Sequence, residues 1–365
     1  MPSAATAPAA PPRPPTGPGD EFAPLLRQVK GQDLLARRTG WYAAGLTVNA
    51  LVLAALALAV LVVGDSWWTV ALAAPLALFS TRTAFFGHDA GHAQIAATRR
   101  TNRLIGLAHG NLLLGMSSAW WNDKHNRHHA NPNHLDKDPD VGEGVMVWTQ
   151  AQAAKRAGLA RLLTRHQAWL FFPLLLLEGF ALKVASARMV LSPSGWERNG
   201  RARLVEGLLI AAHFSGYALL LGTAMSPGKA VVFALVHHAL FGLHLGSVFA
   251  PNHKGMEMPD AAGTRWGHLR RQVLTSRNVR GGPVTDWLMG GLNYQIEHHL
   301  FPSMPRPHLR LARPLVRQYL REAGLPYTET GLVDSYRQAL RHMHEVGAPL
   351  RKPVGAGAGV SPPRS

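Results

Sequence analysis

Long apolar runs without Asp, Glu, Lys or Arg dominate the hydrophobic pattern of the chain. Residues 41–63 carry none of these charges over 23 positions, and residues 230–250 carry none over 21. As a helix rising about 1.5 Å per residue, either run can cross a hydrocarbon core of about 30 Å. Residues 67–86 and 204–225 are interrupted by one charge each, close enough to the end of the run to reach the interface. The pattern predicts four transmembrane helices, and such long runs argue against the alternative of a large soluble core.

A fifth run, residues 168–190, is ambiguous because it contains Pro173, Glu178 and Lys183. Lys and Arg are abundant throughout residues 87–203, whereas the two short loops between paired spans hold a single Lys. The positive-inside rule places the basic stretch in the cytoplasm, so we expect the fifth run to be interfacial or re-entrant. The predicted fold is an all-α integral membrane protein with about four transmembrane helices, an interfacial helix and a cytoplasmic helical cap. Both termini are then cytoplasmic.

The composition mainly excludes several kinds of structure and function. Residues 1–20 and 353–365 are rich in Ala, Pro, Gly and Ser, so we expect disordered tails around one membrane domain at 21–352. No secretory signal pattern is present. The chain has no Cys, which excludes disulfides, thiolate metal sites and a Cys nucleophile. The net charge of +17 flanks the spans, as anionic lipid favours, and we predict no nucleic-acid binding.

Histidine is the main candidate for chemistry, and it occurs in three clusters. The clusters are HDAGH with His88 and His92, HNRHH with His125, His128 and His129, and QIEHH with Gln295, His298 and His299. Spacings of three and four residues put side chains on one face of a helix. The first cluster follows the second span directly, and the other two lie in segments assigned to the cytoplasm. All three clusters can therefore meet at one membrane level.

Such a set of nitrogen ligands predicts a metal centre. Imidazole suits zinc, copper, iron and nickel, and seven nitrogens exceed the four ligands of a single zinc ion. Two metals are therefore expected, and a dinuclear iron site could activate O2. Carboxylates that bond the second ring nitrogen would offset the charge. The candidates for that role are Asp89, Asp123, Asp138, Asp140 and Glu297.

The three clusters with their flanking residues, HDAGH, WWNDKHNRHHANPN and NYQIEHHLFPSMP, resemble the integral-membrane fatty acid desaturase family over residues 85–308. The resemblance implies a non-haem di-iron enzyme that uses O2 to insert a double bond into a fatty acyl chain. It makes the seven clustered histidines the iron ligands. The Gln-type third box is a form seen in front-end desaturases and related bacterial acyl desaturases. The expected location is a bacterial plasma membrane. Gln295 is expected as a weak ligand or an outer donor, and His253, beside Asn252 after the fourth span, as an additional ligand.

The remaining histidines are expected to be structural. His213, His237, His238 and His244 lie in spans, where a polar residue packed between helices is as common as a functional one. The others are expected at the surface or in loops, with His134 the nearest to a cluster: His109, His134, His166, His268, His308, His342 and His344.

The implied partners follow from the reaction. They are a fatty acyl-CoA or acyl-lipid substrate, O2, membrane lipid and a separate electron-transfer protein. The sequence has no His-Pro-Gly-Gly haem motif, no Cys and no GxGxxG loop at a strand-to-helix turn, so the donor is expected to be a ferredoxin, cytochrome or flavin oxidoreductase. We expect an acidic donor to dock on a basic surface formed by Arg99, Arg100, Arg103, Lys124 and Arg127. Two alternatives stay open: a lipid hydroxylase or ketolase with the same centre, and a His-rich membrane metal transporter.

Overall fold

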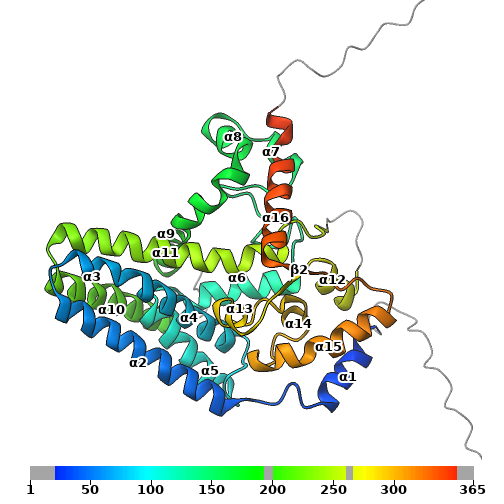
Figure 1. Cartoon of the computed structure of the whole chain (residues 1–365), viewed down its shortest axis with the longest axis horizontal. Coiled ribbons are helices and arrows are strands. Elements are labelled where there is room, and N and C mark those ends of the chain that lie inside the picture. The colour runs from blue at the N-terminus through cyan, green and yellow to red at the C-terminus, as the bar shows by residue number, and fades with distance from the viewer. Residues whose placement is uncertain (1–20, 193–199, 260–265, 352–365) are drawn as a thin grey trace, which may run out of the picture.

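The computed structural model describes residues 21–192, 200–259 and 266–351, and in these ranges the regular structure is helical apart from two short strands (Figure 1). Five helices in the described part are long and apolar enough to cross a membrane: Thr39–Val63 (α2), Trp67–Gly91 (α3 and α4), Gln167–Leu191 (α9), Gly200–Ala224 (α10) and Pro227–His253 (α11). The chain is thus an all-α membrane protein. The predicted tails at 1–20 and 353–365 lie outside the described residues.

The four predicted spans correspond to α2, α3 with α4, α10 and α11. Helix α4 packs between α2 and α11, and the Asn49 amide on α2 donates to Thr83 Oγ1 on α4 at 2.8 Å. The outer side of α2 is apolar and uncovered: Leu51 is 65% exposed and Leu58 60%. A surface of this kind is stable only against hydrocarbon, so it is the part of the molecule that lipid covers.

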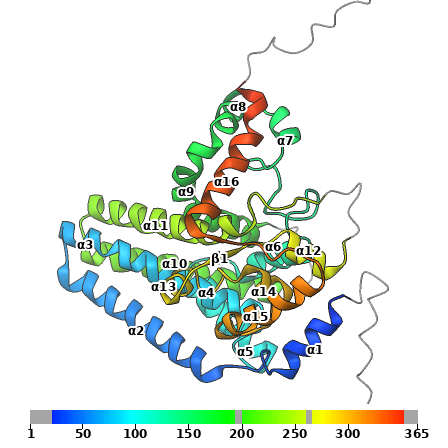
Figure 2. The same cartoon turned by 45° about the vertical axis from the view of Figure 1, so that its right-hand side comes forward.

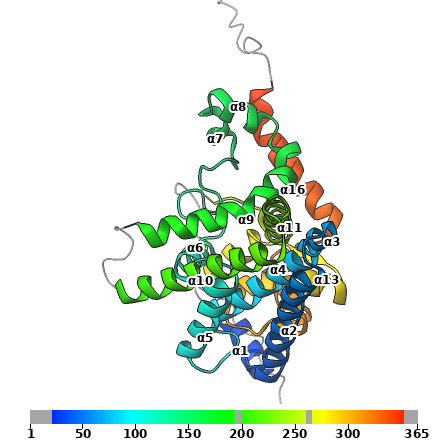
Figure 3. The same cartoon turned by 90° about the vertical axis from the view of Figure 1, so that its left-hand side faces the viewer.

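Helix α9 is the fifth run, and it forms one unbroken helix from Gln167 to Leu191 in spite of Pro173. Figure 3 views α11 along its axis while α9 runs across the view, so α9 crosses α11 and does not run beside it. The crossing is close because Gly179 and Gly242 meet there: a Cβ on Gly242 would lie 2.4 Å from the Gly179 nitrogen. The predicted interfacial or re-entrant location stays a prediction, because α9 is also long and apolar enough to cross a membrane.

Most of the cap lies at the end of the bundle opposite the α3 end of the spans, while α7, α8 and α16 project from the bundle beside α9 (Figures 1 and 2). Its elements are α1 (Ala23–Gly31), α5 (Arg99–Gly106), the π-helix η1 (Leu107–Leu113), α6 (Ser118–Ala130), α7 (Gln150–Ala154), α8 (Gly158–Arg165), α12 (His268–Leu274), α13 (Pro283–Leu288), α14 (Gln295–Leu300), α15 (Arg306–Glu322), α16 (Leu332–Val346) and the 3-10 turn η3 (Ala348–Leu350). A core of Leu25 and Val29 on α1, Ile296 and Leu300 on α14 and Val316 on α15 holds α14 in place.

The two strands tie the cap together across a long sequence distance. Strand β1 (Asn278–Arg280) pairs in parallel with β2 (Glu329–Gly331). The Asn278 side chain then accepts from the Ile296 N–H at 2.8 Å, which fixes the first turn of α14. These protein contacts fix the third histidine cluster to the cap core without a contribution from a metal.

Candidate metal centre

Four helix ends converge on one point, and each brings histidines. The first cluster lies at the C-terminus of α4, the second on α6 and the third on α14, while His253 is the last residue of α11. The Ser117 side chain accepts from the Trp120 N–H and so caps α6. The Glu206 carboxylate of α10 accepts from the Ser117 hydroxyl at 2.5 Å and from the Ala119 N–H at 3.0 Å. A buried carboxylate of a membrane helix therefore holds the N-terminus of the helix that carries HNRHH.

Close approach between α4 and α14 depends on two glycines. Gly290 and Gly291 both have positive φ, 60° and 77°. A Cβ on Gly290 would lie 2.4 Å from the Phe85 ring, and one on Gly291 2.6 Å from the Arg306 side chain. Only glycine allows this turn without strain or collision, and the turn brings QIEHH against HDAGH.

Five histidines form the first group, here called the five-histidine group: His88, His92, His125, His129 and His298. Each offers a ring nitrogen, and these nitrogens lie within 4.8 Å of one another. The Nε2 atoms of His88 and His298 are 3.2 Å apart, those of His92 and His125 2.9 Å, and those of His129 and His298 3.1 Å. The set matches the spacing of donor atoms around a metal ion.

His128, His253 and His299 form the second group, here called the three-histidine group. In each ring Nδ1 faces an oxygen. His128 Nδ1 lies 2.8 Å from Asp138 Oδ2, His253 Nδ1 2.8 Å from the Thr275 carbonyl, and His299 Nδ1 2.9 Å from Gln272 Oε1.

These contacts fix the tautomers of the three-histidine group. An oxygen acceptor requires the proton on Nδ1, so the lone pair of each ring lies on Nε2. The three lone pairs belong to one cluster of buried rings, and His299 Nε2 has no hydrogen-bond partner among the described residues. Converging lone pairs repel one another unless a cation lies between them. The donor set therefore fits a metal ion.

Neighbouring histidines divide between the two groups. His128 and His129 are adjacent on α6 but belong to different groups, and so are His298 and His299 on α14. Successive residues of a helix point about 100° apart. An HH pair thus faces two points, and it contributes one ring to each of the two histidine groups.

Gln295 approaches the three-histidine group through its amide. Its Nε2 lies 2.9 Å from His253 Nε2, and its Oε1 accepts from the Asn252 amide at 3.1 Å. The amide nitrogen therefore faces the lone pair that a metal would use. Asn252 points elsewhere, donating also to the Val248 and Leu292 carbonyls.

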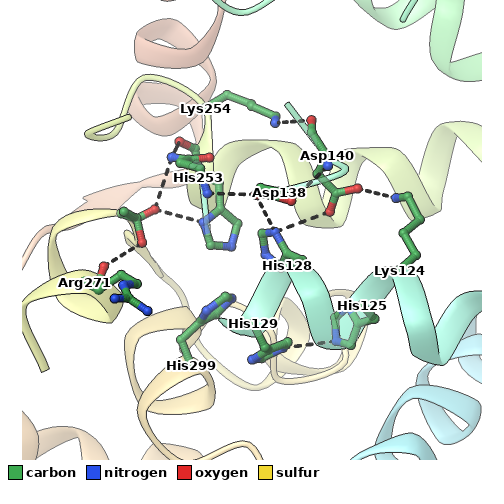
Figure 4. Close-up of polar contacts among 12 residues, drawn as sticks. Lys124, His125, His128, His129, Asp138, Asp140, His253, Lys254, Arg271 and His299 are labelled. Atoms are coloured by element: carbon green, nitrogen blue, oxygen red, sulfur yellow. Dashed lines mark hydrogen bonds and ion pairs between the residues drawn. The ribbon is translucent and has the colours of Figure 1, made fainter. Parts of the chain in front are cut away.

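Carboxylates support one histidine of each group. His88 Nδ1 lies 3.1 Å from Asp89 Oδ1, and the other oxygen of Asp89 is 2.6 Å from Arg306 and accepts from the Tyr42 hydroxyl at 3.0 Å. Figure 4 shows His128 facing both Asp138 and Asp140, with Oδ2 of Asp140 at 3.4 Å from its Nδ1. These three carboxylates act as the sequence predicts.

The other two predicted carboxylates are placed differently. Asp123 is exposed and pairs with Arg127 one turn along α6, so it bonds no histidine. Glu297 is fully buried, but its oxygens accept from the Asn278 amide at 2.8 Å and the Tyr327 hydroxyl at 2.7 Å. Both assignments were wrong because a residue's direction on its helix decides its partner.

Several supporting residues have no signal in the sequence. Tyr42, Gln272, Thr275 and Arg306 come from α2, α12 and α15, far along the chain from the clusters that they contact. A position next to a histidine cluster in the sequence could have suggested a supporting role, but none of these residues is next to the cluster that it supports.

Burial sets the charge of the rings. It lowers the pKa of His92, His125 and His129 well below the usual value, and neighbouring histidines lower it further. The same cause acts on His298 and His299. These rings are neutral near pH 7, which is the form that binds metal. Burial alone would raise the pKa of Asp140, but Lys124 and His128 hold it below its ordinary value.

Comparisons with known proteins show the family of the chain. The sequence model described as "Fatty acid desaturase" matches residues 65–331. The chain belongs to the fatty acid desaturase family. It is 32% identical over 290 residues to the acyl-lipid (9-3)-desaturase of Physcomitrium patens, covering 76% of this chain and 53% of that protein.

Two further desaturases show the same degree of likeness. The Delta(8)-fatty-acid desaturase 2 of Arabidopsis thaliana is 30% identical over 297 residues, 77% of this chain and 64% of that protein. The Delta(6)-fatty-acid desaturase of Caenorhabditis elegans is 30% identical over 284 residues, 76% of this chain and 64% of that protein. The chain thus spans between about half and two thirds of the length of these relatives.

A cavity of about 280 Å³ opens onto both histidine groups of this desaturase-family chain. His88 and His298 of one group and His128 and His253 of the other reach its wall. The apolar part of that wall comes mainly from α6, α9 and α11, including Phe171, and four charged residues also line the cavity: Lys124, Asp140, Glu178 and Lys254. A second, apolar cavity between α4, η1 and α6 is also lined by His88. The two cavities share the lining residues His88, Met116, Trp121, Leu245 and Phe249.

The remaining histidines stay outside both groups. Among the described residues, the four in the spans contact other polar groups: His237 bonds Ser80 at 3.0 Å and Tyr217 at 2.9 Å, for example. His166, His268 and His344 are exposed, as predicted. His134 is buried but lies in the loop after α6, as predicted, where it accepts from the Asp136 N–H. His308 is buried on α15, contrary to prediction, and joins the Leu34 carbonyl to Arg38. His109 and His342 are half-buried.

Proposed function

We propose that this chain is a fatty acyl desaturase that holds two iron ions, one in each histidine group. The carrying observation is the three-histidine group, in which an oxygen facing each Nδ1 leaves the lone pair of each ring on Nε2, beside a second, nitrogen-rich group. The likeness to named desaturases supports the reaction. Bound there, two iron ions would supply the O2 chemistry that removes hydrogen from two adjacent unactivated carbons.

The proposed ligands are the eight histidines of the two groups, with Gln295 as a further ligand or outer donor. Gln295 can offer oxygen only if its amide turns, because the nitrogen faces His253. The Nδ1 contacts of His88, His128, His253 and His299 orient the rings.

The chain's own apolar residues do the binding. The two cavities that meet at His88 offer an acyl chain a bent apolar path past the metal centre, with Phe171, Leu182 and Phe249 among its walls. Burial of methylene groups there would stabilise the bound chain by about 0.8 kcal/mol each and exclude water from the reacting carbons. The substrate is a fatty acyl-CoA or an acyl lipid.

The reaction needs an external source of electrons. One O2 accepts two hydrogen atoms from the acyl chain, two electrons from a donor and two protons from water, which forms one C=C bond and two waters. We propose that a separate ferredoxin, cytochrome or flavin oxidoreductase supplies those electrons. The enzyme lies in the bacterial plasma membrane with the cap and both termini in the cytoplasm.

Product analysis tests the proposal. The chain is expressed in a bacterial host with its donor system, fatty acids are supplied, and methyl esters are analysed by gas chromatography and mass spectrometry. A new double bond is expected with the wild-type chain and none with His298→Ala at equal expression. A hydroxylated product would instead support the hydroxylase alternative, and an unchanged profile from iron-loaded protein would contradict both.

A further inference from the structure

A basic hollow lies on the cap, away from the cavities described above. It has a volume of about 790 Å³ and lies between α15 and the segment that leads into β2. Its wall includes Arg313, Arg317, Gln318, Arg321, Leu325 and Tyr327. The three arginines follow one another at intervals of four residues, so they form one stripe along α15. We call this site the α15 hollow.

The stripe has more positive charge than its surroundings neutralise. Arg313 forms two hydrogen bonds to Glu329, at 2.7 and 2.8 Å, and Arg280 also pairs with Glu329. Among the described residues, no acidic group forms an ion pair with Arg317 or Arg321, and both are exposed. The hollow therefore attracts an anionic partner.

The charged residues around the α15 hollow carry a net positive charge. The arginines at or beside the hollow are Arg280, Arg310, Arg313, Arg317 and Arg321, and the acidic residues are Glu297, Glu322 and Glu329. Glu322 accepts from the Gln318 amide at 2.9 Å, and Glu329 is shared between two arginines.

The floor of the hollow is connected to a histidine ligand. The Tyr327 hydroxyl donates to Glu297 Oε1 at 2.7 Å, and the Asn278 amide contacts both groups, at 2.7 Å and 2.8 Å. Burial raises the pKa of Tyr327, so its proton stays in place. Glu297 directly precedes His298 of the five-histidine group. One hydrogen bond and one peptide unit therefore join a residue of the hollow wall to a proposed iron ligand.

The hollow does not suit the substrate or the membrane. None of its lining residues lines either of the two cavities that meet at His88. Figure 1 shows α15 in the cap, at the opposite end of the molecule from α3. A partner seated there faces the cytoplasm and comes near α14 without obstructing the acyl path.

We propose that the α15 hollow is the docking site of an acidic one-electron carrier protein that reduces the metal centre. The inference rests on the proposed function, which requires two external electrons per turnover. Two carriers, each oxidised by one electron, supply them, and two protons from water complete the reduction of O2. Acidic side chains of the carrier pair with Arg317 and Arg321 while its redox group faces Tyr327.

The sequence pointed to a different surface, and the two can be compared directly. Arg99, Arg100 and Arg103 lie on α5, on another part of the cap, whereas Lys124 is half-buried in the substrate cavity and pairs with Asp140. Arg99 and Arg100 are both exposed, so they offer a charge change equal to that of Arg317 and Arg321.

Steady-state kinetics with the purified full chain provide the test. The donor is a plant-type [2Fe–2S] ferredoxin, an acidic protein, reduced by NADPH through its reductase. The variants are Arg317→Glu/Arg321→Glu, its neutral counterpart Arg317→Gln/Arg321→Gln, and the matched control Arg99→Glu/Arg100→Glu. Iron content equal to wild type confirms folding, and dithionite with a small mediator replaces ferredoxin in a parallel assay.

The expected result is specific to the protein donor. The KM for ferredoxin rises about tenfold or more in the double Glu variant and less in the double Gln variant, and its dependence on salt weakens. Turnover with the small mediator stays within about twofold of wild type, and the α5 control keeps the wild-type KM. A raised KM in the α5 control alone would overturn the proposal.

Two other results are also decisive. Loss of binding to anionic phospholipid vesicles by the double Glu variant, with an unchanged KM for ferredoxin, would make the hollow a lipid contact and overturn the proposal. Absence of a double bond with any donor, including the mediator, would instead defeat the proposed function.

Discussion

The two histidine groups differ in how they are completed. The five-histidine group has five rings and one carboxylate behind them, Asp89 on His88. The three-histidine group has three rings, but each Nδ1 is held by an oxygen, and His128 faces two carboxylates. To bind a metal, the five-histidine group has more ring nitrogens, whereas the three-histidine group has fewer nitrogens that are each oriented by an oxygen. The loss of one ligand should therefore matter more in the smaller group.

The largest effect is expected from removing a ligand of the three-histidine group. His299→Ala leaves two rings there, so we expect the loss of about one iron per chain and a fall in desaturation of more than about 100-fold. His92→Ala leaves four rings in its group and should retain more iron. Metal analysis of both purified variants checks the difference, and equal losses would show that the groups are not distinct.

A smaller effect is expected from the carboxylate behind His128. Asp138→Asn keeps the shape but weakens the bond that orients the ring, so metal affinity should fall about 10- to 100-fold. Asp123→Asn is the matched control, because Asp123 is exposed and bonds only Arg127. Competition with a chelator measures the affinities. If Asp123→Asn has the larger effect, the geometry of α6 is wrong.

Removal of the Gln295 amide should lower metal affinity about tenfold, which is the lower limit for residues that support metal ligands. Gln295→Ala deletes the group that lies 2.9 Å from His253 Nε2. Only the metal of the three-histidine group should be affected. An X-ray absorption spectrum with both sites unchanged would show that Gln295 has no part in the centre.

Acid should destabilise the metal-free protein. Burial lowers the pKa of rings such as His125 and His299 in the folded chain. Near pH 6.5 these rings therefore bind protons in the unfolded chain but stay neutral in the folded chain. Stability is present above that pH and is lost as the pH falls through it. Between pH 7.5 and 6.0 we expect the free energy of unfolding to fall by about 1 kcal/mol for each such ring. Thermal unfolding of iron-free protein measures this, and a melting temperature that rises on acidification would contradict it.

Much of the fold was available from the sequence, because membrane crossing depends on local properties. Uncharged length and hydropathy are properties of a run such as 41–63 itself, and they predicted the four spans. The location of α9 could not be settled in this way, since it depends on the close crossing at Gly179 and Gly242, which are far apart in the chain.

The candidate site was predicted in part for the same reason. Histidine spacing is local, so the three clusters and His253 could be named, and the structure brings all of them together. The division of HH pairs between two groups needed the orientation of α6 and α14. The support from Gln272 and Tyr42 needed tertiary packing, which no local pattern encodes.

The central claim is that two iron ions lie side by side, one in each histidine group. Anomalous X-ray diffraction from crystals of the purified protein, with data on both sides of the iron edge, tests it most directly. We predict two iron peaks, one bounded by the Nε2 atoms of His128, His253 and His299 and the other within the five-histidine group. A single peak, or peaks that appear at the zinc edge and not at the iron edge, would contradict the account.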